Sequence, residues 1–157
     1  MSAYRVREYL SSDQKAFADL NMAWLNEFDF EITEYDQYLL NNPQEAILNH
    51  SGKIFMLFAN ELAVGTLTLI HDSSQIIELG KMTIAKDFRA KGLSRLLLDN
   101  AINYAREQGY RQINLLTNSA LSTAISLYKK YGFIETQIDG SRYGSRADYA
   151  MKLILNN

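Results

Sequence analysis

The segment from Ile76 to Ser94 limits the possible folds of this chain more than any other. Ile76 to Ala85 is apolar and predicts a strand, and a short charged connection leads from it to the start of a helix at Arg89 to Ser94. Gly92 and Ser94 are small, so the backbone at this point can lie close to a ligand. A strand that runs through a tight basic turn into a helix is therefore the unit around which we expect the fold to form.

The start of this helix suits an anion. The amide groups in the first turn of a helix have no partner within the helix, and the helix dipole is positive there. Arg89 and Lys91 add two cations. The segment predicts a site for the diphosphate of a phosphorylated cofactor, although basic loops of this kind also occur on ordinary surfaces. Neither G-x-x-x-x-G-K-[ST] nor G-x-G-x-x-G after a strand is present, so a nucleotide-hydrolysing or dinucleotide-binding fold is not expected.

Composition limits the partners of the chain. The net charge is -2 without a basic block, so nucleic acid is not an expected partner. No apolar run reaches the roughly 18 residues that span a membrane, and the N-terminus lacks the apolar region of a secretory signal. With 157 residues we expect one soluble, cytoplasmic domain over residues 1–157.

Cysteine is absent, and the only histidines, His50 and His71, lie in different segments. Without thiols the chain can form no disulfide, thiolate metal site or cysteine nucleophile. Two separated histidines favour neither a zinc site nor a Ser-His-Asp triad. We therefore expect no metal centre.

Apolar periodicity and turn residues predict an α/β fold with a mixed sheet and the element order β-α-α-β-β-β-α-β-α-β-β. Strands are expected at 3–10, 53–60, 62–71, 76–85, 111–116, 133–138 and 149–155, with a polar loop at 139–148. Four helices are expected: from Ser11 or Ser12 to about Glu27, from Thr33 to Leu40, from Leu93 to Gly109 and from Leu121 to Gly132. Either Ser11 or Ser12 would be the cap of the first helix. Thr33 with Asp36 resembles a capping box, and Pro43 is expected to break or restart the second helix. The strand, helix and strand between residues 76 and 116 predict a right-handed crossover and a parallel pair.

Three sequence patterns occur together in this chain. Arg89-Ala-Lys-Gly-Leu-Ser94 is similar to [QR]-x-x-G-x-[GA], and the strand Glu78 to Ile84 precedes it. Ala124 to Phe133 matches A-x-x-L-Y-x-x-x-G-F. In this order the patterns resemble the GNAT superfamily of acetyl-CoA-dependent N-acetyltransferases, in particular a bacterial subgroup of small enzymes, and the order of elements agrees over essentially the whole chain.

The chain departs from the family pattern at two positions. Ser94 stands where the family usually has Gly or Ala, and its hydroxyl is able to donate to a phosphate oxygen. Leu121 stands where many members have an Asn that hydrogen-bonds the cofactor. Asn118, at the end of the preceding strand, is the candidate to replace that contact.

The resemblance implies acetyl-CoA as the cofactor, in a V-shaped slot where the strand that ends near Ile84 splays from the parallel strand at Ile113. Backbone groups at Met82 to Ile84 are expected to pair with the pantetheine arm and to hold the thioester oxygen. The implied cofactor-binding residues are Met82, Thr83, Ile84, Arg89, Ala90, Lys91, Gly92, Leu93, Ser94, Asn118, Ala124 and Tyr128.

The resemblance also implies two catalytic residues. Glu78 is the candidate base for the amine, acting through water, and two-residue alternation is expected to put it on one face with Met82. Tyr128 is the candidate acid for the leaving thiolate. The alternatives are that Glu78 is paired with Lys81 or Lys53 or is simply solvated, and that Tyr128 only packs in the core.

Substrate-binding residues are expected in the first two helices and the last hairpin, which border the acetyl end of the slot in this fold. The candidates are Trp24, Phe28, Phe30, Glu31, Tyr35 and Tyr143. Acidic residues at 27, 29, 31 and 34 are expected to favour a cationic amine. The simpler alternative is that the aromatic residues belong to the core and that the acidic residues are only solvated.

The predicted function is direct transfer of an acetyl group from acetyl-CoA to a primary amine of a small molecule within a ternary complex. Since the chain has no cysteine, a thiol-linked acyl-enzyme is excluded. Two alternatives stay open: a CoA-binding sensor or partner-binding module without catalysis, and N-terminal acetylation of a peptide or protein. A homodimer is a further option that the resemblance brings.

Overall fold

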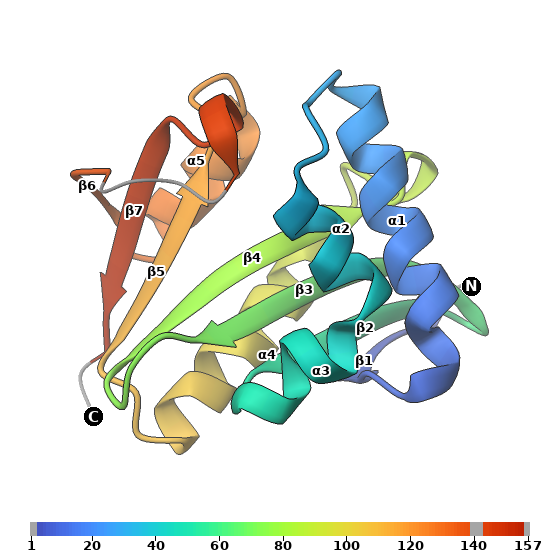
Figure 1. Ribbon diagram of the computed structural model, residues 1–157, viewed down its shortest axis with the longest axis horizontal. Coiled ribbons are helices and arrows are strands. Elements are labelled where there is room, and N and C mark those ends of the chain that lie inside the picture. Colours follow the sequence, from blue (N-terminus) through green and yellow to red (C-terminus); the bar gives the residue numbers. More distant parts are fainter. Residues whose placement is uncertain (1–2, 139–142, 156–157) are drawn as a thin grey trace.

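The computed structural model describes residues 3–138 and 143–155, where seven strands form one mixed sheet in the order β1-β2-β3-β4-β5-β7-β6 (Figure 1). The strands are β1 (Tyr4–Glu8), β2 (Lys53–Ala59), β3 (Leu62–His71), β4 (Ile76–Ile84), β5 (Gln112–Thr117), β6 (Ile134–Thr136) and β7 (Tyr149–Ile154). The helices are α1 (Gln14–Glu27), α2 (Glu34–Asn41), α3 (Pro43–Ala46), α4 (Leu93–Glu107) and α5 (Ser122–Lys130). The predicted order of elements is confirmed, with α3 as an additional short helix.

Helices cover both faces of the sheet, with α1, α2 and α3 on one face and α4 on the other (Figure 1). The apolar side of α4, including Leu97, belongs to one buried cluster with Leu69 of β3. On the opposite face, Phe17 of α1 and Leu39 of α2 form a second cluster with Met56 of β2. Each such side chain contributes roughly 1.5–3 kcal/mol when it is fully buried. Two cores therefore fix the sheet between its helices.

The boundaries of α2 and α3 follow the predicted signals. The Thr33 hydroxyl accepts a hydrogen bond from the Asp36 amide at 3.0 Å, and the Asp36 carboxylate accepts one from the Thr33 amide at 2.9 Å. The predicted capping box is confirmed. Pro43 occupies the first turn of α3, where it needs no amide hydrogen, so the predicted restart is also confirmed.

The predicted cap of the first helix is wrong. Ser11 lies in a 3₁₀ turn, Ser11–Asp13, that precedes α1, and the cap position is occupied by Asp13. The Asp13 carboxylate accepts from the Leu10 amide at 2.8 Å and forms an ion pair with Arg7 at 2.7 Å. An ion pair with β1 thus displaces the hydroxyl cap that the local sequence favours.

Strands β4 and β5 are parallel, as predicted, but they pair over only part of their length. The paired positions run from Ile76 opposite Gln112 to Leu79 opposite Leu115. Beyond Leu79, β4 continues to Ile84 without a partner on this side, while β5 pairs only with β7. The two strands diverge beyond this point (Figure 1).

A β-bulge interrupts β4 at this point. Gly80 pairs with Thr68 and Thr83 with Thr66, so two residues of β4, Lys81 and Met82, lie opposite one residue of β3. Lys81 has a φ of 49°. The bulge reverses the alternation of side chains.

The prediction that Glu78 and Met82 share a face is therefore wrong. Thr83 continues the face of Glu78, whereas Met82 packs against the cluster on the α4 side.

None of the helices in the described ranges is long and apolar enough to cross a membrane.

Candidate active site

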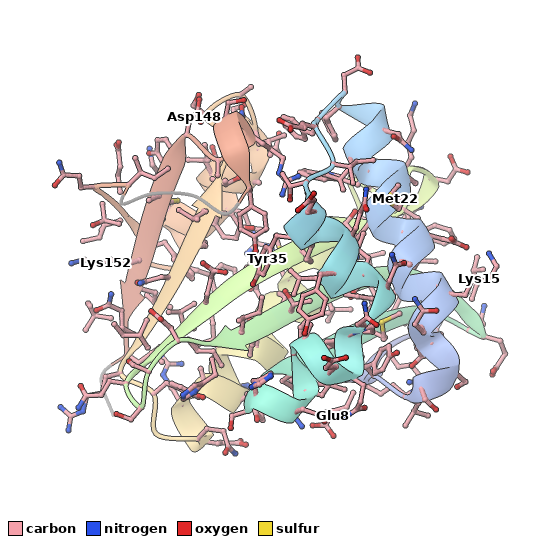
Figure 2. The ribbon with its side chains drawn as sticks, in the orientation of Figure 1. Glu8, Lys15, Met22, Tyr35, Asp148 and Lys152 are labelled. Carbon is pink, nitrogen blue, oxygen red and sulfur yellow. The ribbon has the colours of Figure 1, made fainter. Side chains whose placement is uncertain are left out.

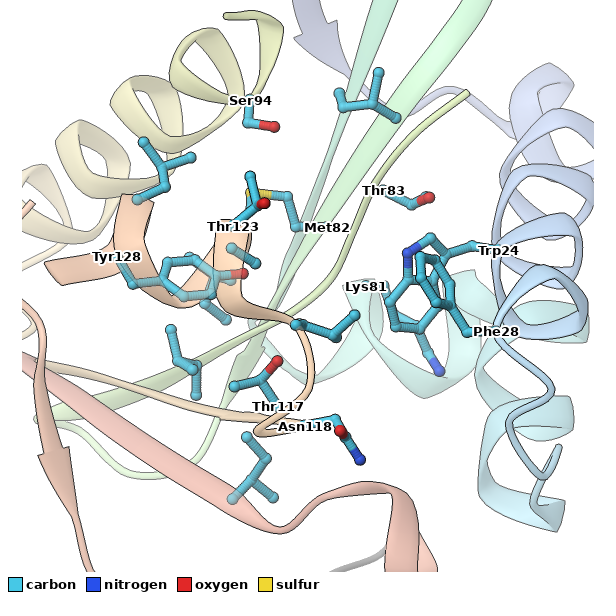
Figure 3. Close-up of a pocket in the computed structure, with 18 of the residues that line it drawn as sticks. Trp24, Phe28, Lys81, Met82, Thr83, Ser94, Thr117, Asn118, Thr123 and Tyr128 are labelled. Carbon is cyan, nitrogen blue, oxygen red and sulfur yellow. The ribbon is translucent and has the colours of Figure 1, made fainter. Parts of the chain in front are cut away.

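A cavity of about 870 Å³ lies where β4 and β5 diverge. Trp24 and Phe28 form one side, Tyr128 and Thr123 form the other, and Met82 lies between them (Figure 3). Its size is typical of a site for a small-molecule ligand. The predicted site residues that line it are Trp24, Phe28, Phe30, Glu78, Met82, Thr83, Ile84, Arg89, Ala90, Gly92, Leu93, Ser94, Asn118, Ala124, Tyr128 and Tyr143.

The first turn of α4 opens into this cavity. Gly92 precedes the helix with a φ of 74°, and no side chain caps the helix. A Cβ at Gly92 would meet no atom within 4 Å. Among the described residues, the amides of Leu93 and Ser94 have no acceptor. Ala90 is also left-handed, at a φ of 61°, which costs roughly 1–2 kcal/mol for a residue other than glycine. The loop thus holds two amides open to an anion.

Arg89 lines the cavity, but its hydrogen bonds lead to α1. Its Nη1 and Nη2 donate to the two carboxylate oxygens of Glu27 at 2.6 and 2.9 Å, and its Nε donates to the Ile84 carbonyl at 2.9 Å. The hydrogen bonds from Arg89 hold the pKa of Glu27 below its ordinary value. Arg89 therefore ties the loop to α1, and its role as a cofactor contact stays a prediction.

Lys91 is exposed and lies outside the cavity lining. It stands between two left-handed residues, Ala90 and Gly92, at which the backbone turns. The structure therefore gives no support to Lys91 as a cofactor contact. Two cations that the sequence analysis missed do line the cavity, Arg95 in the first turn of α4 and Lys130 in the last turn of α5.

Tyr128 combines a buried ring with a hydroxyl that points into the cavity (Figure 3). Its ring packs against Phe133, with the centroids 5.6 Å apart. The ring is therefore part of the core, as one alternative held, while the hydroxyl is available to a ligand. Burial raises the pKa of Tyr128 well above its ordinary value, because the phenolate would be poorly solvated. The phenol stays protonated at neutral pH.

Glu78 is half-buried and lines the cavity from the face of β4 that α1 and α2 cover. Both lysines that were considered as partners of Glu78 also have another carboxylate as a partner. Lys53 forms an ion pair with Glu8 at 2.8 Å, and Lys81 donates to Asp36. The charge of Glu78 still acts on Lys81 and favours its protonated form. Glu78 and Tyr128 therefore reach the same cavity from opposite faces of the sheet.

Three aromatic side chains form the wall on the α1 side. The ring of Trp24 lies 5.3 Å from that of Phe28 and 5.3 Å from that of Phe30, and the last two are 5.9 Å apart. The rings line the cavity, as predicted for a substrate wall. Because they pack on one another, with interplanar angles of 51°, 43° and 23°, they offer one continuous apolar surface to a ligand.

Two of the predicted wall residues do not line the cavity. Neither Glu31 nor Tyr35 is among the residues that line the cavity. Tyr35 projects from α2 toward the half of the molecule that carries β5 and β7, where its ring packs 5.5 Å from that of Tyr143 (Figure 2). Tyr143 does line the cavity, so Tyr35 contributes to the wall only by packing against Tyr143.

A buried ionic cluster, which the sequence analysis missed, closes the same end of the cavity. Asp36 is fully buried and accepts hydrogen bonds from Lys81 and from both Nη atoms of Arg146, at 2.7 and 2.9 Å. Lys81 and Arg146 line the cavity with side chains that are only 7% and 10% exposed. Burial alone would raise the pKa of Asp36, but the bonds from Arg146 and the charge of Lys81 outweigh it and hold this pKa far below its ordinary value. Burial lowers the pKa of Lys81.

The acidic residues at 27, 29, 31 and 34, from which a preference for a cationic amine was expected, do not support that preference. Glu27 pairs with Arg89, and none of the four carboxylates at 27, 29, 31 and 34 lines the cavity. Across residues 3–138 and 143–155, no group of three or more His, Cys, Asp or Glu is placed to hold a metal ion.

Asn118 lines the cavity at the end of β5, with both ends of its carboxamide in use. Its Nδ2 donates to the Arg146 carbonyl at 2.9 Å, and its Oδ1 accepts from the Ala120 amide at 2.9 Å. The first of these bonds holds the backbone of Arg146, whose side chain belongs to the ionic cluster. If Asn118 makes the cofactor hydrogen bond that Leu121 cannot make, it has to use the second hydrogen of its Nδ2 or the second lone pair of its Oδ1.

The sequence of this chain matches the model of the acetyltransferase (GNAT) family over residues 15–133. This chain belongs to the GNAT acetyltransferase family. It is similar to the uncharacterized N-acetyltransferase YvbK of Bacillus subtilis, with 27% identity over 108 residues that cover 67% of this chain and 70% of YvbK. Several other curated N-acetyltransferases match over segments that make up only 26% to 41% of their own length.

Solved structures agree with this GNAT assignment. A GNAT acetyltransferase from Staphylococcus aureus Mu50 superposes with a TM-score of 0.86 at 26% identity, covering 98% of this chain and 100% of that chain. The PaiA N-acetyltransferase of Thermoplasma acidophilum, solved in complex with coenzyme A, has a TM-score of 0.75 at 18% identity and covers 98% and 99% of the two chains. The GNAT fold predicted from the sequence is confirmed.

Proposed function

We propose that this protein transfers an acetyl group from acetyl-CoA to a primary amine of a small molecule, in one step with both substrates bound. One observation carries the proposal: a single cavity joins the open start of α4 to a carboxylate, Glu78, and to a protonated phenol, Tyr128. Membership of the GNAT family supports acetyl-CoA as the cosubstrate, which supplies an acetyl thioester.

The residues present suit coenzyme A. The amides of Leu93 and Ser94 would bind the diphosphate, and Arg95 and Lys130 would add the cations that phosphates require. The space beside Gly92 admits the diphosphate without a clash. Beyond Leu79, the edge of β4 that faces β5 is unpaired and can bond the amides of the pantetheine arm as an added strand would.

Glu78 would act as the base. An aliphatic amine has a pKa of about 10.4 and is mostly protonated at neutral pH, so it must lose a proton before it can attack the thioester. Glu78 would attract the ammonium group and accept this proton, directly or through a water molecule. Backbone amides of β4 at Met82 to Ile84 would bind the thioester oxygen as it gains negative charge.

Tyr128 would act as the acid. The departing thiolate has a conjugate acid with a pKa of about 8.5, so it benefits from a hydrogen-bond donor at its sulfur. The hydroxyl of Tyr128 is protonated and points into the cavity. Since burial raises its pKa well above that of a thiol, Tyr128 would stabilise the leaving thiolate by donating a hydrogen bond, and the thiolate would take up its proton from solvent.

The test is thiol release from acetyl-CoA with a panel of primary amines, comparing the wild type with Glu78→Gln. At pH 7 the variant is expected to lose roughly 10²–10⁴-fold in kcat/KM, and the loss should shrink toward pH 10 as the amine deprotonates in solution. Glu107→Gln, at the exposed end of α4, serves as the matched control and should behave like the wild type.

Two results would count against the proposal. Absence of thiol release with every amine, although CoA binds, would favour the sensor or partner-binding alternative. Full activity of Glu78→Gln across the pH range would remove Glu78 from the mechanism.

A further inference from the structure

We propose that the acceptor amine also carries a carboxylate, as a free amino acid does, and that Arg146 and Lys81 bind this carboxylate. The inference rests on the proposed function, because it assigns the acceptor for the same cavity. It replaces the expectation of a purely cationic amine.

The charges that line the cavity are the first observation. Among the described residues, five cationic side chains line it and Glu78 is the one carboxylate: the cations are Lys81, Arg89, Arg95, Lys130 and Arg146. Arg95 and Lys130 lie on α4 and α5, at the end assigned to the cofactor phosphates, and Arg89 is paired with Glu27. Two cations thus remain at the acceptor end, and both belong to the buried cluster around Asp36.

This buried cluster holds two cations on one carboxylate, and among the described residues that line the cavity only Glu78 adds a further negative charge, which acts on Lys81. Asp36 is the shared carboxylate for both Lys81 and Arg146, and all three side chains are at least nine-tenths buried. Tyr143 packs against both cations, with its ring centroid 5.2 Å from the Lys81 ammonium and 4.9 Å from the Arg146 guanidinium. A buried charge that is incompletely paired is costly, so an anionic ligand would be bound favourably here.

The guanidinium of Arg146 is held so that one edge remains for a ligand. Its Nη1 donates to Asp36 and to the Glu31 carbonyl, and its Nη2 donates to Asp36. Its Nε hydrogen and the second Nη2 hydrogen have no acceptor among the described residues, and these two hydrogens form an edge that fits a carboxylate. Asn118 fixes the backbone of Arg146 from β5.

Glu78 completes the match to an amino acid. It lies three residues before Lys81 on β4, lines the same cavity and acts on the charge of Lys81. A zwitterion can place its ammonium group toward Glu78 and its carboxylate toward Arg146 and Lys81. The aromatic wall of Trp24, Phe28 and Phe30 would then face the remainder of the molecule, which favours an apolar side chain.

A polyamine fits this end less well. Its second cation would need another carboxylate in the lining, and within the described residues Glu78 has no such neighbour there. The second ammonium group would instead meet Lys81 and Arg146, and like charges repel.

The experiment compares acceptor pairs that differ by the carboxylate alone: phenylalanine with phenethylamine, and leucine with 3-methylbutylamine. With acetyl-CoA, the wild type is expected to show a kcat/KM at least tenfold higher for each amino acid than for its amine. Arg146→Gln should reduce this preference by roughly tenfold to a hundredfold through KM for the amino acid, with little change in KM for the amine. Arg111→Gln, an exposed arginine outside the cavity lining, is the matched control and should keep the preference.

The outcomes separate this inference from the proposed function. A wild type that acetylates phenethylamine as well as phenylalanine overturns the inference and leaves the acetyltransferase proposal intact. If no amine is acetylated, calorimetry of phenylalanine against the CoA-saturated protein still decides: binding of phenylalanine but not of phenethylamine supports the subsite, and equal or absent binding overturns it. Partial unfolding of Arg146→Gln would lower kcat for both acceptors alike, which the KM ratio distinguishes from loss of the subsite.

Discussion

Tyr128 shows how burial sets the chemistry of a single residue. Its ring packs against Phe133 in the core while its hydroxyl points into the cavity, so the side chain presents one polar atom to a ligand. Among the described residues the hydroxyl has no partner to lose on substitution. Its effect on catalysis can therefore be measured apart from its effect on folding.

We expect Tyr128→Phe to lower kcat by roughly 10²-fold while the free energy of unfolding changes by less than about 0.5 kcal/mol. Because burial raises the pKa of Tyr128, the wild type should show no loss of activity from deprotonation of this residue below about pH 10. Tyr131→Phe is the control, since this exposed hydroxyl donates to Asp99 at 2.8 Å on the surface. Steady-state kinetics and urea unfolding measure both effects, and an equal loss of kcat in the two variants would contradict the assigned role.

At the scale of elements, the start of α4 is defined by its backbone. Gly92 adopts a left-handed conformation that leaves the helix uncapped and the first amides open, and Arg89 ties the preceding loop to the end of α1. The same helix ends with a second left-handed glycine, Gly109, with a φ of 85°. Both glycines are left-handed, but of the two only Gly92 lines the cavity.

This pair allows a controlled test of the cofactor site. Gly92→Ala and Gly109→Ala should each cost roughly 1–2 kcal/mol of stability, because both place a Cβ on a left-handed backbone without a steric clash. Only Gly92→Ala should raise the KM for acetyl-CoA, by roughly tenfold, because its methyl group would occupy space that the diphosphate needs. Thermal unfolding and kinetics at varied acetyl-CoA give the two quantities. If Gly109→Ala raised this KM as much, the diphosphate would not lie at the start of α4.

At the scale of the whole molecule, Asp36 holds together three segments that are far apart in the sequence. Its carboxylate completes the capping box at the start of α2, and it bonds Lys81 at a separation of 45 residues and Arg146 at a separation of 110 residues. These bonds join the helical layer over β2 and β3 to β4 and to the turn before β7. The acceptor end of the cavity therefore depends on one buried carboxylate.

Asp36→Asn is expected to lower the free energy of unfolding by about 3–5 kcal/mol at pH 7, because it leaves two buried cations without a charged partner. The pKa of Asp36 is lower in the folded than in the unfolded protein, so its contribution is present above about pH 4 and is lost as the pH falls below this value. The difference in stability between the wild type and Asp36→Asn should therefore narrow from pH 6 to pH 3.

Chemical unfolding at several pH values measures this difference. Asp19→Asn, which affects only an exposed pair with Lys15 within one helix, should cost less than about 1 kcal/mol. A constant difference between the wild type and Asp36→Asn from pH 6 to pH 3 would show that the charge of Asp36 does not stabilise the fold.

Local signals in the sequence were sufficient for most of the architecture. The 3.6-residue period of α4, the capping box at Thr33 and the restart at Pro43 act over a few residues, and short-range hydrogen bonds and sterics determine them. The motif that contains Tyr128, Gly132 and Phe133 was likewise sufficient to indicate the GNAT family. Where an ion pair with the preceding strand competes with a helix cap, as between Arg7 and Asp13, the cap signal failed.

The sequence by itself determined the order of strands and helices, the glycine at the start of α4 and the two groups proposed for catalysis. Only the tertiary structure decided the pairing of charges. It showed that Arg89 binds Glu27, that the bulge at Lys81 separates Met82 from the face of Glu78, and that Asp36, Lys81 and Arg146 form one buried cluster. The physical reason is that secondary structure depends on neighbours in the sequence, whereas desolvation and ion pairing depend on groups that only folding brings together.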